Sequence, residues 1–183
     1  ITLGADVPLS GLDKANGQAV LRGVQLALAQ ANERSKPEFP YTLKLRALDD
    51  VPDAASEAND TIGLQNIQAL KDDPLVAGVI GPYNTNVAMA QIPLVNQADN
   101  KLALVSPSTT AECLTGPKAV NQTRTQYGCD QGYLNGKDAT GAFFRIAAQN
   151  NKMADVYANC LSAEVAAVTG TCPKLPHRDG SRY

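Results

Sequence analysis

Short apolar segments alternate along the chain with longer segments in which apolar residues recur every three or four positions. The short segments predict strands within residues 1–11, 41–50, 75–82 and 101–107. The longer segments predict helices over 17–34, 53–73 and 86–98, the last with Val87, Ala90, Leu94 and Ala98 on its inward face. Strands joined by helices of this length form right-handed crossovers between parallel strands. The alternation therefore predicts an α/β fold, a doubly wound parallel sheet with helices on both faces.

The alternation stops after Pro107 and resumes near residue 141. Residues 108–142 are polar and contain Cys113 and Cys129, which predicts a long loop. A strand is predicted within 141–149, and a helix over 151–168 with Met153, Val156 and Cys160 facing inward. From Gly170 onward the chain has no period and reads as an irregular tail. The predicted organisation is one domain over residues 1–148, which includes the 108–142 loop, followed by a helix and tail over 149–183.

Composition and charge exclude several classes of protein. The 183 residues are 44% hydrophobic and 19% charged, typical of a globular protein and not of a disordered chain. The net charge of -2, with no basic block, argues against a nucleic-acid or anionic-membrane partner. The chain has no apolar run long enough to predict a membrane-spanning segment, and no leader precedes Ile1, so we expect a signal peptide, if the gene encodes one, to lie outside this sequence.

The four cysteines favour two local disulfides, Cys113 with Cys129 and Cys160 with Cys172. Disulfides imply an oxidising compartment, although free buried cysteines remain the alternative. His177 is the only histidine, which argues against a Cys/His zinc site and against thiol catalysis with a histidine partner.

Small polar residues gather where three of the predicted strands end. These positions are Ser10 and Asn16 after the first strand, Tyr83, Asn84 and Thr85 after the third, and Ser106, Ser108, Thr109 and Thr110 after the fourth. In open parallel sheets, ligands bind at the carboxyl ends of the strands. Hydroxyl and backbone N–H groups near helix starts suit a small anionic or zwitterionic ligand. The alternative is that these residues only cap helices and close turns.

Catalytic motifs are missing from the sequence. It has no nucleophile elbow, phosphate-binding loop or dinucleotide fingerprint. Asp49 and Asp50 follow the second strand and could form an acidic Mg²⁺ or phosphoryl-accepting site, but capping of the next helix is the favoured interpretation. We therefore predict a protein that is not an enzyme and that holds no metal or cofactor. A flavodoxin-like enzyme with a bound cofactor is a less favoured alternative.

Several segments together resemble a known family. They are "GADVPLSGLDKANGQAVLRGVQLALAQAN", "LDD", "LKDDPLVAGVIGPYNTNVAMAQIPLVNQADNKLALVSPSTTAECLT" and "FFRIAA". Over about residues 1–160 the chain resembles the first lobe of type I periplasmic binding proteins, in the leucine and branched-chain amino acid binding branch that serves ABC transporters. The resemblance implies that residues 1–148 are a ligand-binding lobe one and that 149–183 are a crossing helix and a truncated second lobe.

The resemblance also assigns roles to residues at the strand ends. It implies that Thr85, Ser108 and Thr110 contact the charged end of an amino acid and that Tyr83 lines the side-chain pocket. Asn16 stands where some members place an aromatic ring, a departure from the pattern. The implied protein is periplasmic or extracellular, lipid-anchored in a full-length precursor, and delivers a small amino acid to an ABC transporter permease. A ligand-sensing receptor domain of the same fold is the alternative.

Overall fold

The computed structural model describes residues 1–34, 40–54, 56–97, 102–115 and 141–166. The chain divides into two compact units, Ile1–Gln149 and Asn150–Tyr183. Among the described residues, the first unit contains the sheet, three α-helices and a short 3-10 helix, η1 (Glu112–Leu114), and the second contains α5 (Asn150–Ala166). That these units correspond to a first lobe and a crossing helix stays a prediction.

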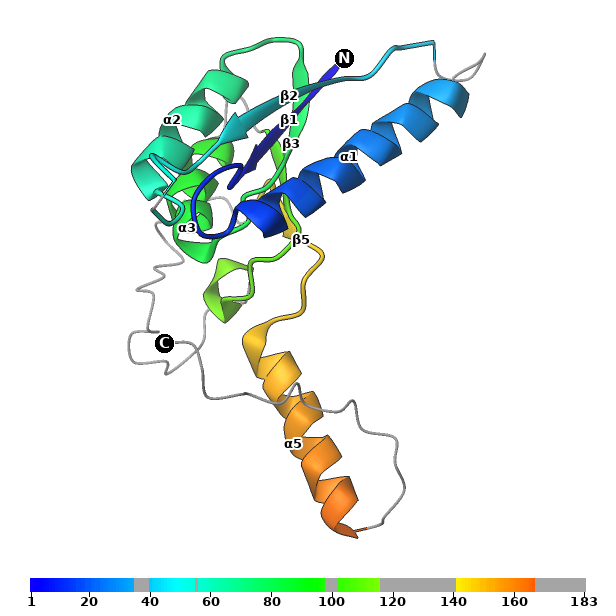
Figure 1. The fold of residues 1–183 in the computed structure, drawn as a ribbon, viewed down its shortest axis with the longest axis vertical. Helices are drawn as coiled ribbons and strands as arrows, with labels where there is room; N and C mark the ends of the chain where they lie inside the picture. The colour runs from blue at the N-terminus through cyan, green and yellow to red at the C-terminus, as the bar shows by residue number, and fades with distance from the viewer. Residues whose placement is uncertain (35–39, 55, 98–101, 116–140, 167–183) are drawn as a thin grey trace. The chain divides into compact units, whose positions relative to one another are not determined.

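Five parallel strands form one sheet in the order β2-β1-β3-β4-β5. The strands are β1 (Thr2–Val7), β2 (Lys44–Asp49), β3 (Val76–Ile80), β4 (Ala103–Ser106) and β5 (Phe143–Arg145). From β1 the chain moves outward to β2 and then returns past β1 to β3, so the winding direction reverses between β1 and β3 (Figure 1). The fold is the predicted doubly wound α/β sheet, and its switch point lies between β1 and β3.

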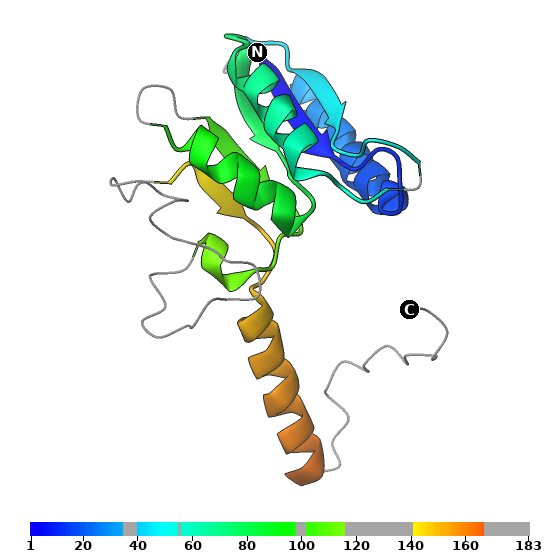
Figure 2. The same ribbon diagram turned by 90° about the vertical axis from the view of Figure 1, so that its left-hand side faces the viewer.

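Helices cover both faces of this sheet. The helix α1 (Lys14–Arg34) packs on β1 and β2 from one side, and α2 (Asp60–Lys71) and α3 (Thr85–Val95) lie side by side on the other (Figures 1 and 2). Between α2, α3 and the sheet lies the main core, which includes Ile67, Leu70, Val79, Ile92, Leu104 and Phe143. No helix among the described residues is both long and apolar enough to cross a bilayer.

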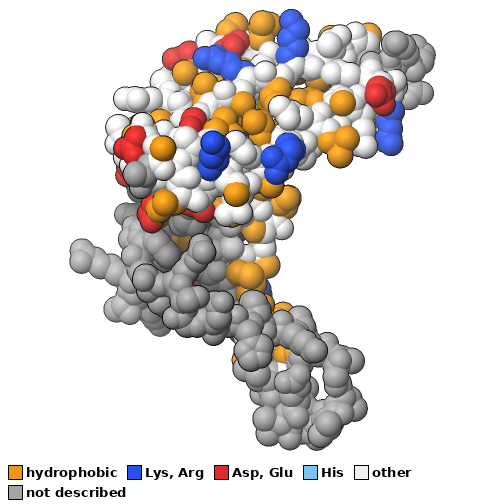
Figure 3. Space-filling model, viewed as in Figure 1, with side chains coloured by type: hydrophobic (Ala, Val, Ile, Leu, Met, Phe, Trp, Pro, Cys, Tyr) orange, Lys and Arg blue, Asp and Glu red, His pale blue; other side chains and the backbone are white. Residues whose placement is uncertain are grey.

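The α1 side of the sheet is less evenly covered. Ala5, Ile80, Val105 and Phe144 are register partners in one row across β1, β3, β4 and β5. Ala5 beneath α1 is fully buried, whereas Phe144 at the other end of the row is 55% exposed and Ile146 beyond it is 79% exposed. On the face seen in Figure 3, described side chains of both charge signs are interspersed.

Two predictions about helix starts are wrong. The helix α2 begins at Asp60, not near residue 53, because Asn59 caps it by accepting the N–H of Ile62 at 3.1 Å. Asp49 and Asp50 therefore do not cap this helix. Asp49 instead accepts the backbone N–H of Leu9 at 2.8 Å, which ties the end of β2 to the segment after β1.

Two predictions about helix faces also need correction. The buried residues of α3 are Val87, Ala88, Gln91, Ile92 and Val95. Ala90 and Leu94 are only half-buried, because they face the groove beside α2 and not the sheet, and Ala98 lies outside the described residues. In α5, Met153 and Cys160 are half-buried but Val156 is 58% exposed. A periodic stripe predicts a helix, but burial also requires a partner surface.

Candidate functional site

The ends of β1, β3 and β4 are adjacent, because these strands are neighbours in a parallel sheet. Two side-chain contacts join the segments that follow them. Asn84, after β3, donates from Nδ2 to Asp13 Oδ2 at 3.1 Å across to the segment after β1. Ser108, after β4, donates its hydroxyl to the carbonyl of Tyr83. The predicted polar residues of three strand ends are thus brought to one edge of the sheet.

A sharp backbone turn at Gly81 and the hydrogen bonds of Ser106 connect the strand-end segments at this edge. Gly81 has φ +134°, and a Cβ at this position would lie 2.2 Å from the Asp6 carbonyl oxygen, so only glycine fits. The next residue is Pro82, whose carbonyl accepts the Ser106 hydroxyl at 2.7 Å. The same Ser106 Oγ accepts the N–H of Thr109 at 3.1 Å. Ser106 therefore fixes the segments after β3 and β4 against each other.

Arg145 positions the segment that follows Thr109. Its guanidinium, at the end of β5, donates to the carbonyl of Ala111 at 2.6 Å and to that of Thr109 at 3.4 Å. Thr110 lies between these two anchored carbonyls. Its backbone path is set by a side chain from a neighbouring strand.

Most of the predicted site residues are partly accessible. Ser10, Tyr83, Asn84, Thr85, Ser108 and Thr110 are half-buried, and Asn16 is exposed. Thr109 is different, because it is 1% exposed and its hydroxyl lies inside the protein without a hydrogen-bond partner. Thr109 is therefore turned away from the solvent-accessible part of the site.

The start of α3 offers N–H groups at this edge. Thr85 is the first residue of α3, and Asn84 in the cap position makes no side-chain hydrogen bond to the helix. The Asn84 amide is directed to Asp13 instead. The first N–H groups of α3 consequently have no cap from that side chain, and such groups attract anions.

Sequence reasoning missed one residue that organises the candidate site. Asp13 connects two strand-end segments, since Oδ1 accepts from Asn16 Nδ2 at 3.3 Å and Oδ2 accepts from Asn84. Ser106 belongs to the polar cluster after the fourth predicted strand, but its contacts to Pro82 and Thr109 were not predicted. Asp13 directly precedes the observed helix α1 but not the predicted helix over 17–34, and its partner 71 positions later in the chain, Asn84, is set by the tertiary fold.

Two carboxylates are buried beneath the strand ends. Asp6, at the end of β1, accepts from Asn66 Nδ2 at 2.7 Å and from Gln91 Nε2. Burial, followed by the charge of Asp50, raises the pKa of Asp6 from 3.8 to about 7. Burial, followed by the charge of Asp49, raises the pKa of Asp50 to about 7 as well. Among the described residues, no group of three or more His, Cys, Asp or Glu side chains is placed to hold a metal ion.

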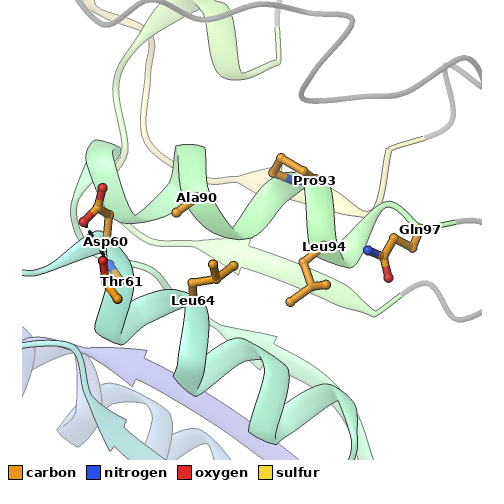
Figure 4. Close-up of a pocket in the computed structure, with 7 residues that line it drawn as sticks. All are labelled: Asp60, Thr61, Leu64, Ala90, Pro93, Leu94 and Gln97. Carbon is orange, nitrogen blue, oxygen red and sulfur yellow. Dashed lines mark hydrogen bonds between the residues drawn. The ribbon is translucent and has the colours of Figure 1, made fainter.

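A separate groove lies between α2 and α3 (Figure 4). Its volume is about 370 Å³, and Leu64 of α2 points into it toward the α3 side chains. The lining residues are Asp60, Thr61, Leu64, Ala90, Pro93, Leu94 and Gln97. None of the predicted site residues lines this groove, which lies in the helical layer and not at the strand ends.

Known structures share this fold. An ABC transporter substrate-binding protein from Desulfitobacterium hafniense is 25% identical over 90% of this chain, with a TM-score of 0.64, and its structure in complex with Leu gives 0.65. The leucine binding protein LivK from Thermotoga maritima is 20% identical over 91% of the chain, with a TM-score of 0.56. The LivJ protein from Streptococcus pneumoniae, in complex with isoleucine, is 25% identical over 63% of the chain, with a TM-score of 0.53.

These matches cover only part of each known protein. The chain spans 39% of the length of the Desulfitobacterium hafniense protein, 36% of LivK and 30% of LivJ. No family model and no curated protein sequence matches the chain. The resemblance stated from the four sequence segments is confirmed at the level of fold: the chain has the type I periplasmic binding protein fold over part of its length, in common with ABC substrate-binding and branched-chain amino acid binding proteins.

Proposed function

We propose that the protein is an extracytoplasmic, non-enzymatic solute-binding protein that captures a small amino acid of the branched-chain type for an ABC importer. The observation that carries the proposal is the convergence of the ends of β1, β3 and β4 at the uncapped start of α3. Structures of similar fold at 25% identity carry Leu or isoleucine, which supports an amino acid as the ligand class. The proposal of an ABC transporter permease as partner rests on the same similarity to ABC transporter substrate-binding proteins.

In the proposed site, the amino acid carboxylate lies at the start of α3. The N–H groups of the first turn and the Thr85 hydroxyl would donate to it, as donors at helix starts commonly do for anions. Thr110 would supply a second hydroxyl from the segment after β4. The Ser108 hydroxyl donates its hydrogen to the Tyr83 carbonyl, so its oxygen is left to accept a hydrogen bond from the ligand.

We expect the 183-residue chain to bind leucine weakly. It spans 39% of the length of the similar substrate-binding protein, so the proposed site lacks the contacts that the remaining length would add. Each hydrogen bond in a site open to water contributes about 0.5 to 1.5 kcal/mol. Association costs about 4 kcal/mol or more, which leaves a Kd in the millimolar range or weaker.

NMR titration of the isotope-labelled chain tests the proposal. Leucine, isoleucine and valine should shift the amide signals of Ser10, Thr85, Ser108 and Thr110. The Thr85→Val variant should bind roughly three- to tenfold more weakly, because one hydrogen bond to a charged ligand is lost. Thr61→Val, an exposed position beside the α2–α3 groove, is the matched control and should bind like the unaltered chain.

Two outcomes would contradict the proposal as stated. The proposed amino acid site is contradicted if the amide shifts are confined to residues away from the strand ends. It is also contradicted if no signal shifts at ligand concentrations of tens of millimolar. Micromolar binding would instead contradict the argument that this chain supplies only part of the contacts.

The proposed extracytoplasmic location makes a separate prediction about the cysteines. Neither Cys113 nor Cys160 is a free thiol in the structure, and Cys129 and Cys172 lie outside the described residues. We expect peptide mapping without reductant to recover Cys113 linked to Cys129 and Cys160 linked to Cys172. A closed loop of this size could contribute about 3 kcal/mol to stability. Free thiols at these positions after oxidative purification would count against an oxidising compartment.

A further inference from the structure

We infer that Asp13 is a specificity-determining residue that receives the ammonium group of the ligand at the strand-end site. This inference rests on the proposed function and adds to it the chemical group that the site selects. Asp13 was not among the residues predicted from the sequence, and it lies in the connection from β1 to α1, directly before Lys14.

The Asp13 carboxylate is held in place but keeps capacity for a ligand. Oδ1 accepts one hydrogen bond from Asn16 and Oδ2 accepts one from Asn84. A carboxylate can accept about four hydrogen bonds, so about half of its acceptor sites stay open. Asp13 is half-buried, which leaves it in reach of a small molecule while its two amide partners restrict its rotamers.

Asp13 forms no ion pair within the described part of the chain, where Arg46 pairs with Asp73 and Lys152 pairs with Asp155. Asp13 lies close to the buried Asp50, since its charge is a further cause, after burial and the charge of Asp49, that raises the pKa of Asp50. Because the Asp13 carboxylate has no described cationic partner, a positively charged ligand group is favoured beside it over a neutral or anionic one.

The influence of Asp13 reaches across the site to the end of β3. Burial is the main cause that raises the pKa of Tyr83, and the Asp13 charge is the second. This agrees with the direct contact between Asp13 and Asn84, the next residue. Asp13 therefore acts on the same strand-end segment that leads into α3.

Asn84 is held in one orientation beside Asp13. Its Oδ1 is buried and has no hydrogen-bond partner. The amide cannot simply rotate to relieve this, because the donating Nδ2 would then be turned away from Asp13. Because Asn84 Oδ1 is enclosed by protein, as the Thr109 hydroxyl is, the ligand ammonium would use the open acceptor sites of Asp13.

The same residue joins the two parts of the proposed site. Asn84 occupies the cap position of α3, where the ligand carboxylate is proposed to lie, and its side chain contacts Asp13. The proposed positions of the ligand carboxylate and ammonium are therefore connected through one residue.

Three ligands with the same branched alkyl group isolate the contribution of Asp13. Leucine carries both charges, 4-methylpentanoate lacks the ammonium group, and 3-methylbutylamine lacks the carboxylate. NMR titrations of the unaltered chain should show leucine binding several-fold more tightly than 4-methylpentanoate. Asp13→Asn keeps the side-chain shape and removes the charge. In this variant the affinity for leucine should fall roughly three- to tenfold, and the preference for leucine over 4-methylpentanoate should disappear.

Two further variants serve as controls. Asp13→Glu keeps the charge and should retain at least part of the preference for leucine. Asp155→Asn removes an exposed carboxylate on α5 and should leave all three affinities unchanged. Unchanged melting temperature and amide spectrum of Asp13→Asn outside the site would show that the variant folds normally.

The outcomes separate this inference from the proposed function. One outcome is that leucine shifts the amide signals of the strand-end residues equally in Asp13→Asn and in the unaltered chain, with the preference over 4-methylpentanoate kept. In that case the role of Asp13 is overturned and the proposed function stands. If leucine does not bind but 3-methylbutylamine shifts Asn84 only when Asp13 is present, the amino acid proposal fails and the cation-selective role stands. If no ligand shifts these residues, both are overturned.

Discussion

Asp6 and Asp50 are unusual because both are fully buried carboxylates. Asp6 is supported by amide donors from α2 and α3, whereas both carboxylate oxygens of Asp50 lack a hydrogen-bond partner. A buried charge without a partner is costly, and the cost falls when the group binds a proton. The two residues therefore make folding stability depend on pH.

We expect the free energy of unfolding to fall as the pH rises from about 4 to about 7. The pKa of both groups is about 7 in the folded protein against 3.8 ordinarily, so the folded state binds more protons than the unfolded state in this window. Stability is then lost with rising pH and levels off above about 7. Urea unfolding at pH 5 and at pH 8 measures the difference.

Asp50→Asn should reduce this pH dependence, because it removes one of the two titrating groups. Its stability should approach or exceed that of the unaltered chain at pH 8. Glu57→Gln removes an exposed carboxylate and should change the free energy of unfolding at neither pH 5 nor pH 8. Equal stability of the unaltered chain at both pH values would show that neither carboxyl is protonated in the folded state.

The contact between α2 and α3 depends on a small residue. Gly63 of α2 lies against α3, and a Cβ at this position would be 2.3 Å from Val87 Cγ1. Its carbonyl also accepts Gln91 Nε2 at 2.8 Å, so the same turn of α2 anchors the side chain that supports Asp6. Close helix packing and the buried polar network are thus coupled.

Gly63→Ala should destabilise the protein by about 1 to 3 kcal/mol, because Val87 is fully buried and cannot move without disturbing the core. The gain in helix propensity, at most about 1 kcal/mol, does not offset this clash. Chemical denaturation provides the measurement. Gly23→Ala in α1 is the matched control, since a Cβ there would have nothing within 4 Å, and it should stabilise by about 0.5 to 1 kcal/mol. A stabilising Gly63→Ala would contradict the packing argument.

At the scale of the molecule, the sheet is buried unequally on its two faces. Val79, Leu104 and Phe143 are buried beneath α2 and α3. On the other face, burial decreases from Ala5 under α1 to Phe144 near the β5 edge. Adjacent residues of the same strand therefore have very different roles in stability.

Phe143→Ala should cost about 3 to 5 kcal/mol, as expected for removal of a buried aromatic side chain. Phe144→Ala should cost about 1 kcal/mol or less, because this ring is already largely in water. The pair can be compared by thermal and urea unfolding of the two variants. Similar losses would mean that Phe144 is covered in solution by a surface that the described residues do not supply.

The sequence by itself determined the order and type of the elements and the edge of the sheet at which the polar strand ends meet. Periodicity reports local structure, and the strand ends after Val7, Ile80 and Ser106 share an edge because crossovers between parallel strands bring their carboxyl ends together. That rule is sufficient to group Ser10, Asn84 and Ser108 without any knowledge of their contacts.

Only the tertiary structure decided which side chains meet. Asn59 rather than Asp49 caps α2, the buried face of α3 is set by its packing on both the sheet and α2, and Thr109 is turned inward. Asp13 joins the segment after β1 to the segment after β3 because Asn84, far away in sequence, donates to it. Hydrogen-bond partners and burial are supplied by other elements of the fold, so a periodic pattern within one segment does not contain them.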